Sequence, residues 1–507
     1  MQDSSSVAQL VASLRKDLHR YSEGEKLPSS RELVSRYRVS PVTVSRAVSA
    51  LAAEGLVVSR PGTGVFRSVP PRTAGPPGDV SWQDVALSAD PSPAPVDASS
   101  RSAGAEGLLA TLTPPPPEVI DLGGGYLHPV LQPESALAAA LARAGRRPGA
   151  WSRPPVEGIT ELRHWFARDI GGPDGRLGAS DVLITAGGQS ALTTALRALA
   201  SPGAPVLVES PTYPGLLAVA RAAGLRPVPV PVDADGIRTD LLAEAFRATR
   251  ARAFVCQPLF QNPTGAVLSP QRRREVLRIA RSHSAFVLED DFARRLVHAD
   301  TPRLPPPLAA DDPDGLVVHV RSLTKATSPS LRIGALAARG PVYERLRAIQ
   351  VIDSFFVPRP LQETALELVG SPAWSRHLRS LAAALRDRRT AALAALREVL
   401  PRLLPDRPPH GGYHLWLRLP GGTDENAVAA AALRAGVAVT PGGPYFAAEA
   451  PGPHLRLSYV NTPGAGQFEE GVRRLRRACP RLGGTPDAEE TPGGPAAPRP
   501  GCAGPSA

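Results

Sequence analysis

The sequence predicts an α/β protein preceded by a small winged helix-turn-helix domain, and three observations support this fold class. Between about residues 118 and 480, short apolar runs of β type alternate with helical segments rich in Ala, Leu and Arg, which indicates a mostly parallel sheet covered by helices. Residues 1–69 show helices followed by a β-hairpin instead. A proline-rich segment over 70–117 separates the two patterns, so we expect folded domains joined by a long linker.

Composition describes a soluble globular protein with an excess of positive charge. Of 507 residues, 42% are apolar and 21% are charged, and the net charge is +11, which suits a polyanionic partner such as nucleic acid. The three cysteines, Cys256, Cys479 and Cys502, have neither metal-ligand nor disulfide spacing. We therefore expect no metal site and a reducing, cytoplasmic setting. The scarcity of Lys and Met beside abundant Ala, Arg, Gly and Pro suggests a GC-rich bacterial genome, and a nucleic-acid partner there would make the protein nucleoid-associated. Neither a secretory signal nor an apolar run long enough to span a membrane is apparent.

The N-terminal elements are marked by helix-capping signals. Apolar residues over 7–18 recur at helical spacing and predict a first helix. Ser29 and Glu32 form a capping-box pattern that opens a second helix. Ser40, followed by proline, marks the N-terminus of a third. Apolar residues then flank RPGTG at 60–64, which predicts a two-stranded wing.

The stretch LPSSRELVSRYRVSPVTVSRAVSALAAEGLVVSRPGTGVF at 27–66 carries the most specific signal of this domain. It resembles the DNA-binding domain of bacterial GntR-type regulators. The resemblance implies that the third helix enters the major groove of double-stranded DNA while the wing reaches the minor groove. The expected DNA-contacting residues are Arg31, Ser40, Thr43, Arg46, Gly62, Thr63 and Gly64. Pro41 and Ser45 stand where the family often has arginine, and Arg46 is expected to compensate.

The C-terminal region contains five apolar runs that are typical of buried strands, with helical segments between them. The strands are DVLIT, PVLVES, AFVCQP, AFVLED and LVVHV, and the helices include QSALTTALRAL and RRREVLRIARSH. Sheets of this kind bind ligands at the carboxyl ends of their strands. A smaller subdomain is expected from about residue 345. Residues 481–507 are rich in Pro and Gly and poor in apolar residues, so a disordered tail is expected there.

Lys325, in SLTKATSPSLRIG, is the only lysine after residue 70, in a region with 47 arginines. Arginine cannot lose its proton in a protein, whereas a lysine amine can be deprotonated and form a Schiff base. The alternative is that this lysine stands there by chance. Its neighbours favour the Schiff-base interpretation.

The other parts of a pyridoxal 5′-phosphate (PLP) site follow in chain order. Such a site needs a carboxylate against the pyridine nitrogen, a donor to the phenolate oxygen, and N–H groups with an arginine for the phosphate. Asp290 or Asp291 would supply the carboxylate, and Asn262 in QNPTG the donor. The remaining candidates are Gly188, Gln189, Ser190, Ser322 and Arg332 for the cofactor's phosphate end, Tyr213 against its ring, and Arg456 for a substrate carboxylate.

This order of motifs resembles the fold type I PLP-dependent enzymes of the aspartate aminotransferase family over about residues 118–480. QNPTG followed by the S-x-x-K-x6-R pattern is its most specific part. The resemblance favours Asp290 over Asp291 at the pyridine nitrogen. It also implies a homodimer, since fold type I sites are built at a subunit interface. Phe292 stands where the family usually has a tyrosine that donates to the phenolate oxygen.

A GntR-type domain, a linker and an aminotransferase-like domain in this order resemble the MocR-type regulators across nearly the whole chain. The resemblance implies a homodimeric regulator of vitamin B6 or amino-acid metabolism genes. It would bind an operator with paired half-sites and sense PLP, an amino acid or an amine through an aldimine at Lys325. One alternative is an active PLP-dependent aminotransferase with an accessory DNA-binding domain. Another is a structural DNA-binding protein that uses the fold only to dimerise.

Overall fold

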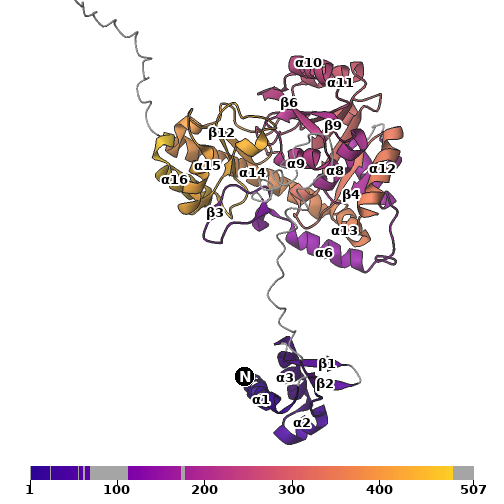
Figure 1. Ribbon diagram of the computed structural model, residues 1–507, viewed down its shortest axis with the longest axis vertical. Coiled ribbons are helices and arrows are strands. Elements are labelled where there is room, and N and C mark those ends of the chain that lie inside the picture. Colours follow the sequence, from indigo (N-terminus) through magenta and orange to yellow (C-terminus); the bar gives the residue numbers. More distant parts are fainter. Residues whose placement is uncertain are drawn as a thin grey trace, which may run out of the picture. The chain divides into compact units, whose positions relative to one another are not determined.

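The chain forms two compact units, Met1–Pro93 and Ala94–Ala507, each described by itself (Figure 1). A computed structural model describes residues 2–22, 24–54, 56–60, 63–68, 112–172 and 177–483. Among these residues, no helix combines the length and the apolar character needed to cross a membrane.

Helices and one hairpin build the N-terminal unit: α1 (Gln2–Asp17), α2 (Ser30–Tyr37), α3 (Pro41–Ala53), β1 (Val57–Arg60) and β2 (Gly64–Arg67). The expected capping box opens α2, because the Glu32 N–H donates to Ser29 Oγ and the Ser29 N–H donates to Glu32 Oε2. Ser40 Oγ accepts the Thr43 N–H at 3.1 Å and caps α3. A core of apolar side chains closes the unit, including Leu10, Leu14, Leu18, Leu33, Val44 and Leu51. The winged helix-turn-helix order is confirmed.

Eight strands form the large sheet of the C-terminal unit, in the order β4-β11-β10-β9-β8-β5-β6-β7. They are β4 (Val182–Thr185), β5 (Pro205–Ser210), β6 (Arg226–Asp233), β7 (Gly236–Ile237), β8 (Ala253–Cys256), β9 (Phe286–Asp291), β10 (Val317–Ser322) and β11 (Gly334–Ala337). The pairs from β10 to β6 are parallel, whereas β11 is antiparallel to both neighbours and β7 is antiparallel to β6. The α/β class with a mostly parallel sheet is confirmed, and β6, β7 and β11 join the five predicted strands.

Helices cover both faces of this sheet because successive side chains on a strand point to opposite faces. On β8, Phe254 and Cys256 belong to one apolar core, and Ala253 and Val255 belong to the other. The first core includes side chains of α7 (Thr160–Gly171), α10 (Thr239–Thr249) and α11 (Pro270–Ser282). The second includes side chains of α8 (Gly188–Leu199), α9 (Pro214–Ala222) and α12 (Pro341–Ser354).

A smaller subdomain contains a three-stranded sheet, β12-β15-β14, and a two-stranded sheet, β13-β3. Its elements are β3 (Ile120–Asp121), α14 (Pro372–Val399), β12 (His414–Arg418), α15 (Glu425–Arg434), β13 (Val437–Ala438), β14 (Thr440–Pro441), β15 (His454–Ser458) and α16 (Ala465–Ala478). Before it, α12 packs on α8, while α13 (Arg359–Val369) packs on α6 (Glu134–Gly145) and α7. Apart from β3, the subdomain is therefore built from α14 onward, later than the expected residue 345.

Two other expected boundaries differ from the structure. The linker expected over 70–117 ends earlier, because Leu112 already lines a pocket of the C-terminal unit; residues 69–111 lie outside the described part of the chain. The tail expected over 481–507 does not include residues 481–483. Leu482, in the 3-10 helix Pro480–Gly483, is 2% exposed and belongs to the core, whereas residues 484–507 lie outside the described part.

Leu482 is expected to stabilise the C-terminal unit although it lies in a segment with a tail-like composition. Replacing Leu482 by Ala should lower the free energy of unfolding by about 2–5 kcal/mol, because it leaves a cavity in the core. Urea unfolding followed by tryptophan fluorescence measures the change. Leu433→Ala is the matched control, since Leu433 is 50% exposed; equal effects of the two variants would contradict the assignment.

Candidate functional site

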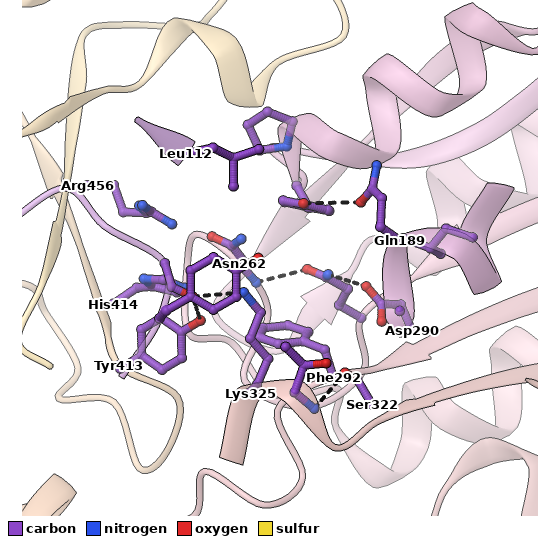
Figure 2. A pocket seen from close by; sticks show the side chains of 18 of the residues that line it. Leu112, Gln189, Asn262, Asp290, Phe292, Ser322, Lys325, Tyr413, His414 and Arg456 are labelled. Atoms are coloured by element: carbon purple, nitrogen blue, oxygen red, sulfur yellow. Dashed lines mark hydrogen bonds between the residues drawn. The ribbon is translucent and has the colours of Figure 1, made fainter. Parts of the chain in front are cut away.

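A pocket lies where the carboxyl ends of the large sheet's strands meet the smaller subdomain (Figure 2). Nine of the ten residues predicted to bind cofactor or substrate line it: Gly188, Gln189, Tyr213, Asn262, Asp290, Ser322, Lys325, Arg332 and Arg456. Ser190, the tenth, lies in the first turn of α8 but is not among the lining residues. Residues far apart in the chain thus meet at the edge of the sheet where ligands are expected.

Lys325 enters the pocket from a single turn of 3-10 helix just after β10. Its Nζ donates a hydrogen bond to the Gly125 carbonyl at 2.8 Å and lies 3.9 Å from the centre of the Tyr126 ring. Desolvation by the surrounding protein, followed by the nearby charge of Arg456, lowers the pKa of Lys325 to about 7. In a substantial share of the molecules, the Lys325 amine is therefore neutral at physiological pH. The neutral amine is the form that attacks a carbonyl.

Asp290 faces the pocket because side chains alternate along β9. Gln257 Nε2 donates to Asp290 Oδ2 at 2.7 Å. Burial raises the pKa of Asp290 to about 6, against the opposing influence of Gln257 and of Lys325. A cationic group placed against this carboxylate would favour its charged form, and the protonated ring nitrogen of PLP is such a group.

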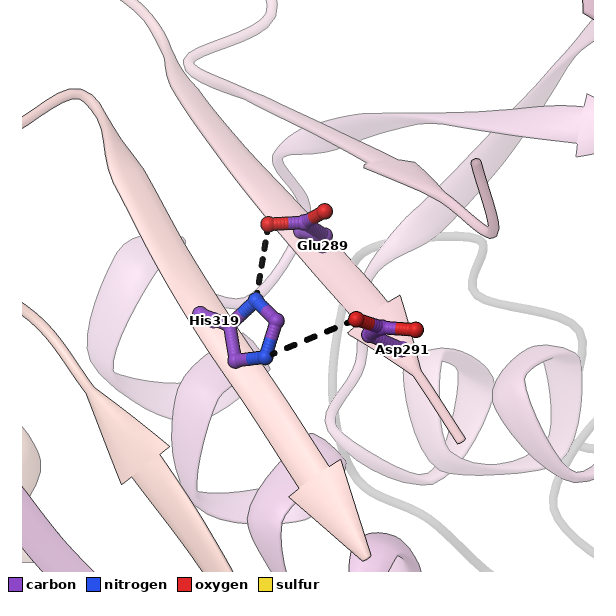
Figure 3. Close-up of side chains that lie close together, drawn as sticks. All are labelled: Glu289, Asp291 and His319. Carbon is purple, nitrogen blue, oxygen red and sulfur yellow. Dashed lines mark hydrogen bonds and ion pairs between the residues drawn. The ribbon is translucent and has the colours of Figure 1, made fainter. Parts of the chain in front are cut away.

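The neighbours of Asp290 on β9 point to the opposite face and meet His319 of β10 (Figure 3). His319 Nδ1 lies 2.7 Å from Glu289 Oε2, and His319 Nε2 lies 4.0 Å from Asp291 Oδ2. Glu289 also accepts the backbone N–H groups of Leu308 and Ala309. The carboxylate and imidazole atoms of this cluster lie within 4.8 Å of one another, a spacing that a metal ion could bridge.

Arginines supply the positive charge to this cluster. Arg321 is 1% exposed, with Nη1 2.9 Å from Asp291 Oδ2 and Nε 3.2 Å from Asp169 Oδ2. Burial alone would raise the pKa of Asp291, but Arg321 and Arg294 outweigh it and lower the pKa to about 2. Arg321 is the register partner of Asp291 in the parallel β9–β10 pair. The ion pair therefore fixes the strand ends from which Asp290 and Lys325 reach the pocket.

Arg332 and the N-terminus of α8 form an anion-binding corner. Gly187 precedes α8 with a φ of 87°, and the first N–H groups of a helix, here those of 188–190, lack a carbonyl partner within it. Arg332 donates to the Ala186 carbonyl at 2.8 Å. A Cβ on Gly187 would lie 2.9 Å from Arg332 Nη2, so glycine is what lets the guanidinium approach. Helix N–H groups beside an arginine suit a phosphate.

At the other end of the pocket, Arg456 of β15 is 3% exposed. It donates through Nη2 to the Gly123 carbonyl, and its guanidinium carbon lies 5.4 Å from the centre of the Tyr445 ring. The position is suited to a ligand carboxylate, because a guanidinium binds carboxylates with paired hydrogen bonds.

Four buried polar atoms of the lining residues have no hydrogen-bond partner within the described part of the chain. They are Asn262 Oδ1, Thr324 Oγ1, His414 Nδ1 and Arg456 Nε. Because buried polar atoms are nearly always paired, this pocket is suited to a polar ligand. Lys325 for an aldehyde, Asp290 for a ring nitrogen and the corner at Arg332 for a phosphate together fit PLP.

Several lining residues were missed from the sequence: Tyr126, Gln257, Tyr413, His414, Tyr445 and Leu112. The run GGGY at 123–126 was an available signal, because a Cβ on Gly124 would lie 1.7 Å from Asn461 Nδ2. Tyr413 and His414 are adjacent at the start of β12, which pairs with the distant β15. Local sequence patterns do not encode that pairing.

The expected DNA-contacting residues of the N-terminal unit differ in accessibility. Arg31, Ser40, Arg46 and Thr63 are exposed and Gly64 is half-buried. Thr43 is only 7% exposed, and its hydroxyl lies 2.8 Å from Ser40 Oγ. The Thr43 side chain thus contributes to the helix cap, and contact of Thr43 with DNA stays a prediction, as it does for the other residues. Gly62 lies outside the described residues.

Comparison with known proteins identifies the family. Residues 117–475 match the family model of the class I and II aminotransferases. The chain belongs to the aminotransferase class I and II family. Residues 6–66 of the same chain match a second family model, that of the bacterial regulatory proteins of the gntR family. It is therefore a GntR-family regulator fused to an aminotransferase-like domain.

Relatives of this aminotransferase family member include enzymes and regulators. A 2-aminoadipate transaminase of Thermus thermophilus is 33% identical over 72% of this chain and 91% of its own. The uncharacterized HTH-type transcriptional regulator YisV of Bacillus subtilis is 28% identical over 91% of this chain and 93% of its own. The crystal structure of LysN, the α-aminoadipate aminotransferase of Thermus thermophilus with N-(5′-phosphopyridoxyl)-L-leucine, superposes with a TM-score of 0.68 at 31% identity. It covers 75% of this chain and 97% of that one.

Removing the Arg321 charge should destabilise the C-terminal unit. Arg321→Met leaves Asp291 and Asp169 buried with less compensation, which is expected to lower the free energy of unfolding by about 3–5 kcal/mol. Denaturant titration measures this. Arg238→Met, which breaks an exposed ion pair with Asp240, is the control and should have little effect. An Arg321 variant as stable as this control would show that the buried pair is dispensable.

Proposed function

We propose that this protein is a PLP-responsive transcriptional regulator whose pocket at Lys325 senses PLP, alone or together with an amino acid or an amine. The observation that carries the proposal is the Lys325 amine, which lines one pocket with Asp290 and Arg332, in a chain that also has a GntR-family domain. PLP supplies an aldehyde that reacts with amines and a ring that withdraws electrons. The relatives that share both domains support a regulator.

The roles of the chain's own groups follow from their positions. Lys325 offers a neutral amine near neutral pH, held by the Gly125 carbonyl until a ligand replaces that hydrogen bond. Asp290, fixed by Gln257, favours a protonated ring nitrogen. The N–H groups of α8 and Arg332 bind the phosphate. Asn262 Oδ1 and Thr324 Oγ1, which have no hydrogen-bond partner within the described residues, can bind polar groups of the ligand.

The proposed regulatory assembly is a homodimer formed through the aminotransferase-like domain. Two winged domains would then bind two half-sites of one operator, with a spacing that the dimer permits. The target genes would belong to vitamin B6 or amino-acid metabolism. A ligand changes DNA binding only if it binds two states of the dimer with different affinity.

A working aminotransferase is the second candidate. It is favoured by the 33% identical relative named as a 2-aminoadipate transaminase and by the meeting of Asn262, Asp290, Lys325 and Arg456 in one pocket. Phe292 also lines this pocket (Figure 2) and has no hydroxyl to donate to the cofactor. Formation of keto acids from a panel of amino acids tests this candidate, and absence of turnover would count against it.

PLP should change the affinity of the wild-type protein for DNA from its own upstream region. We expect a change of about fivefold or more, the usual range for coupled sites, together with a cofactor absorption band. Lys325→Ala and Lys325→Arg should lose both. The Arg variant is the matched control, because it keeps the charge but cannot supply a neutral amine. If both variants respond to PLP as the wild type does, Lys325 is not the sensor.

Uptake of PLP by the cofactor-free protein should depend on the protonation of Lys325. The neutral fraction of an amine rises with pH through its pKa, so the initial rate of uptake should rise with a midpoint near pH 7. A lysine with an unperturbed pKa would give a midpoint at about pH 10.4. Absorbance after rapid mixing measures the rate, with Lys325→Ala as the background. A midpoint near that of an ordinary lysine would contradict the assigned environment.

A further inference from the structure

His414 and Arg456 lie on the same face of the three-stranded sheet. In the antiparallel pair β12–β15, His414 is opposite Ser458 and Trp416 is opposite Arg456. Residues opposite one another share a face, and so do residues two apart on a strand. His414 and Arg456 are therefore diagonal neighbours, and both line the pocket (Figure 2).

His414 presents a neutral imidazole with an unused nitrogen. The side chain is 6% exposed, and Nδ1 has no partner within the described part of the chain. Burial, reinforced by the charges of Arg456 and Lys325, lowers the pKa of His414 well below its usual range. A neutral imidazole carries one N–H group, so His414 can donate one hydrogen bond from Nδ1 without adding charge when its proton is on that nitrogen.

Arg456, which also lines the pocket, has an unpaired hydrogen-bond donor within the described part of the chain. One of its nitrogens is bound to the Gly123 carbonyl, but Nε, also buried, has no partner among the described residues. A carboxylate accepts about four hydrogen bonds, so a single carboxylate can satisfy the guanidinium and the imidazole together. Carbonyl, hydroxyl and amine groups offer fewer acceptor sites and no charge to match that of Arg456.

We propose that His414 is a specificity-determining residue that, together with Arg456, binds the carboxylate of an effector α-amino acid. The effector class is thus the amino acids, and amines without a carboxylate are excluded. An amine that entered this pocket would leave both buried nitrogens without a partner, which is the feature that makes polar sites reject analogues strongly. This inference rests on the proposed function, since it names the ligand of the same site.

The test compares amino acids with the amines that lack only the carboxylate. The full chain is loaded with PLP and titrated with L-leucine or 3-methylbutylamine, and with L-phenylalanine or 2-phenylethylamine. The shift of the cofactor absorption band yields an apparent Kd without requiring turnover. The wild type should bind each amino acid at least about a hundredfold more tightly than its amine. In His414→Leu this ratio should fall by about tenfold or more, the effect of losing one hydrogen bond to a charged group.

Two variants separate recognition from a structural effect. His414→Asn places an amide nitrogen close to the position of Nδ1, so it should recover most of the ratio. His283→Leu, on the stacked pair with Phe246 outside this pocket, should leave the ratio unchanged. An unchanged ratio in His414→Leu, or an equal loss for amines and amino acids, would overturn this inference alone. Absence of a cofactor band in the wild type would overturn the proposed function, and this inference with it.

Discussion

Three consecutive carboxylates, Glu289, Asp290 and Asp291, are buried at the end of one strand. The histidine, arginines, amide and backbone N–H groups packed around β9 compensate their charge. An isolated carboxylate in a protein interior is strongly unfavourable, so each needs positive charge or hydrogen-bond donors. Alternation along β9 sends two of them behind the sheet, to His319 and the arginines. Asp290 alone faces the pocket, where the Gln257 amide donates to it and the nearby Lys325, whose pKa is about 7, carries only part of a positive charge. The charge of the Asp290 carboxylate is thus only partly compensated within the fold, and a cationic ligand ring beside it would complete the compensation.

The remaining walls of the pocket come from segments that only the fold brings together. Gly125 accepts hydrogen bonds from both Lys325 and Tyr413, which links the strand region near β3 with β10 and β12. The large sheet supplies the groups suited to cofactor binding, and the smaller subdomain supplies Arg456 and His414. Movement of the smaller subdomain would therefore change the ligand's carboxylate contacts without disturbing the phosphate corner.

Sequence patterns predicted the groups whose chemistry is tied to their own local element. The helix caps at Ser29 and Ser40, the strand that ends in Asp290 and the isolated Lys325 are of this kind. His414 and Tyr445 escaped notice because their places depend on antiparallel pairing and packing across the smaller subdomain, which local periodicity does not encode. The contact between the Ser40 and Thr43 hydroxyls was not predicted either, because the residue pattern of a helix does not show which side chains its own cap engages. Composition likewise assigned 481–483 to a tail, although Leu482 is buried in the core.

The scarcity of lysine has a further consequence for a protein that handles a reactive aldehyde. Aldehydes attach to any accessible primary amine, and a lysine-rich surface would bind the cofactor at many unrelated places. Beyond residue 70 this chain has a single side-chain amine, and it opens on the pocket. Guanidinium groups, which stay protonated, fill the other basic positions. The C-terminal unit thereby offers an aldehyde one side-chain amine for a Schiff base, so that formation of this bond reports occupancy of the pocket.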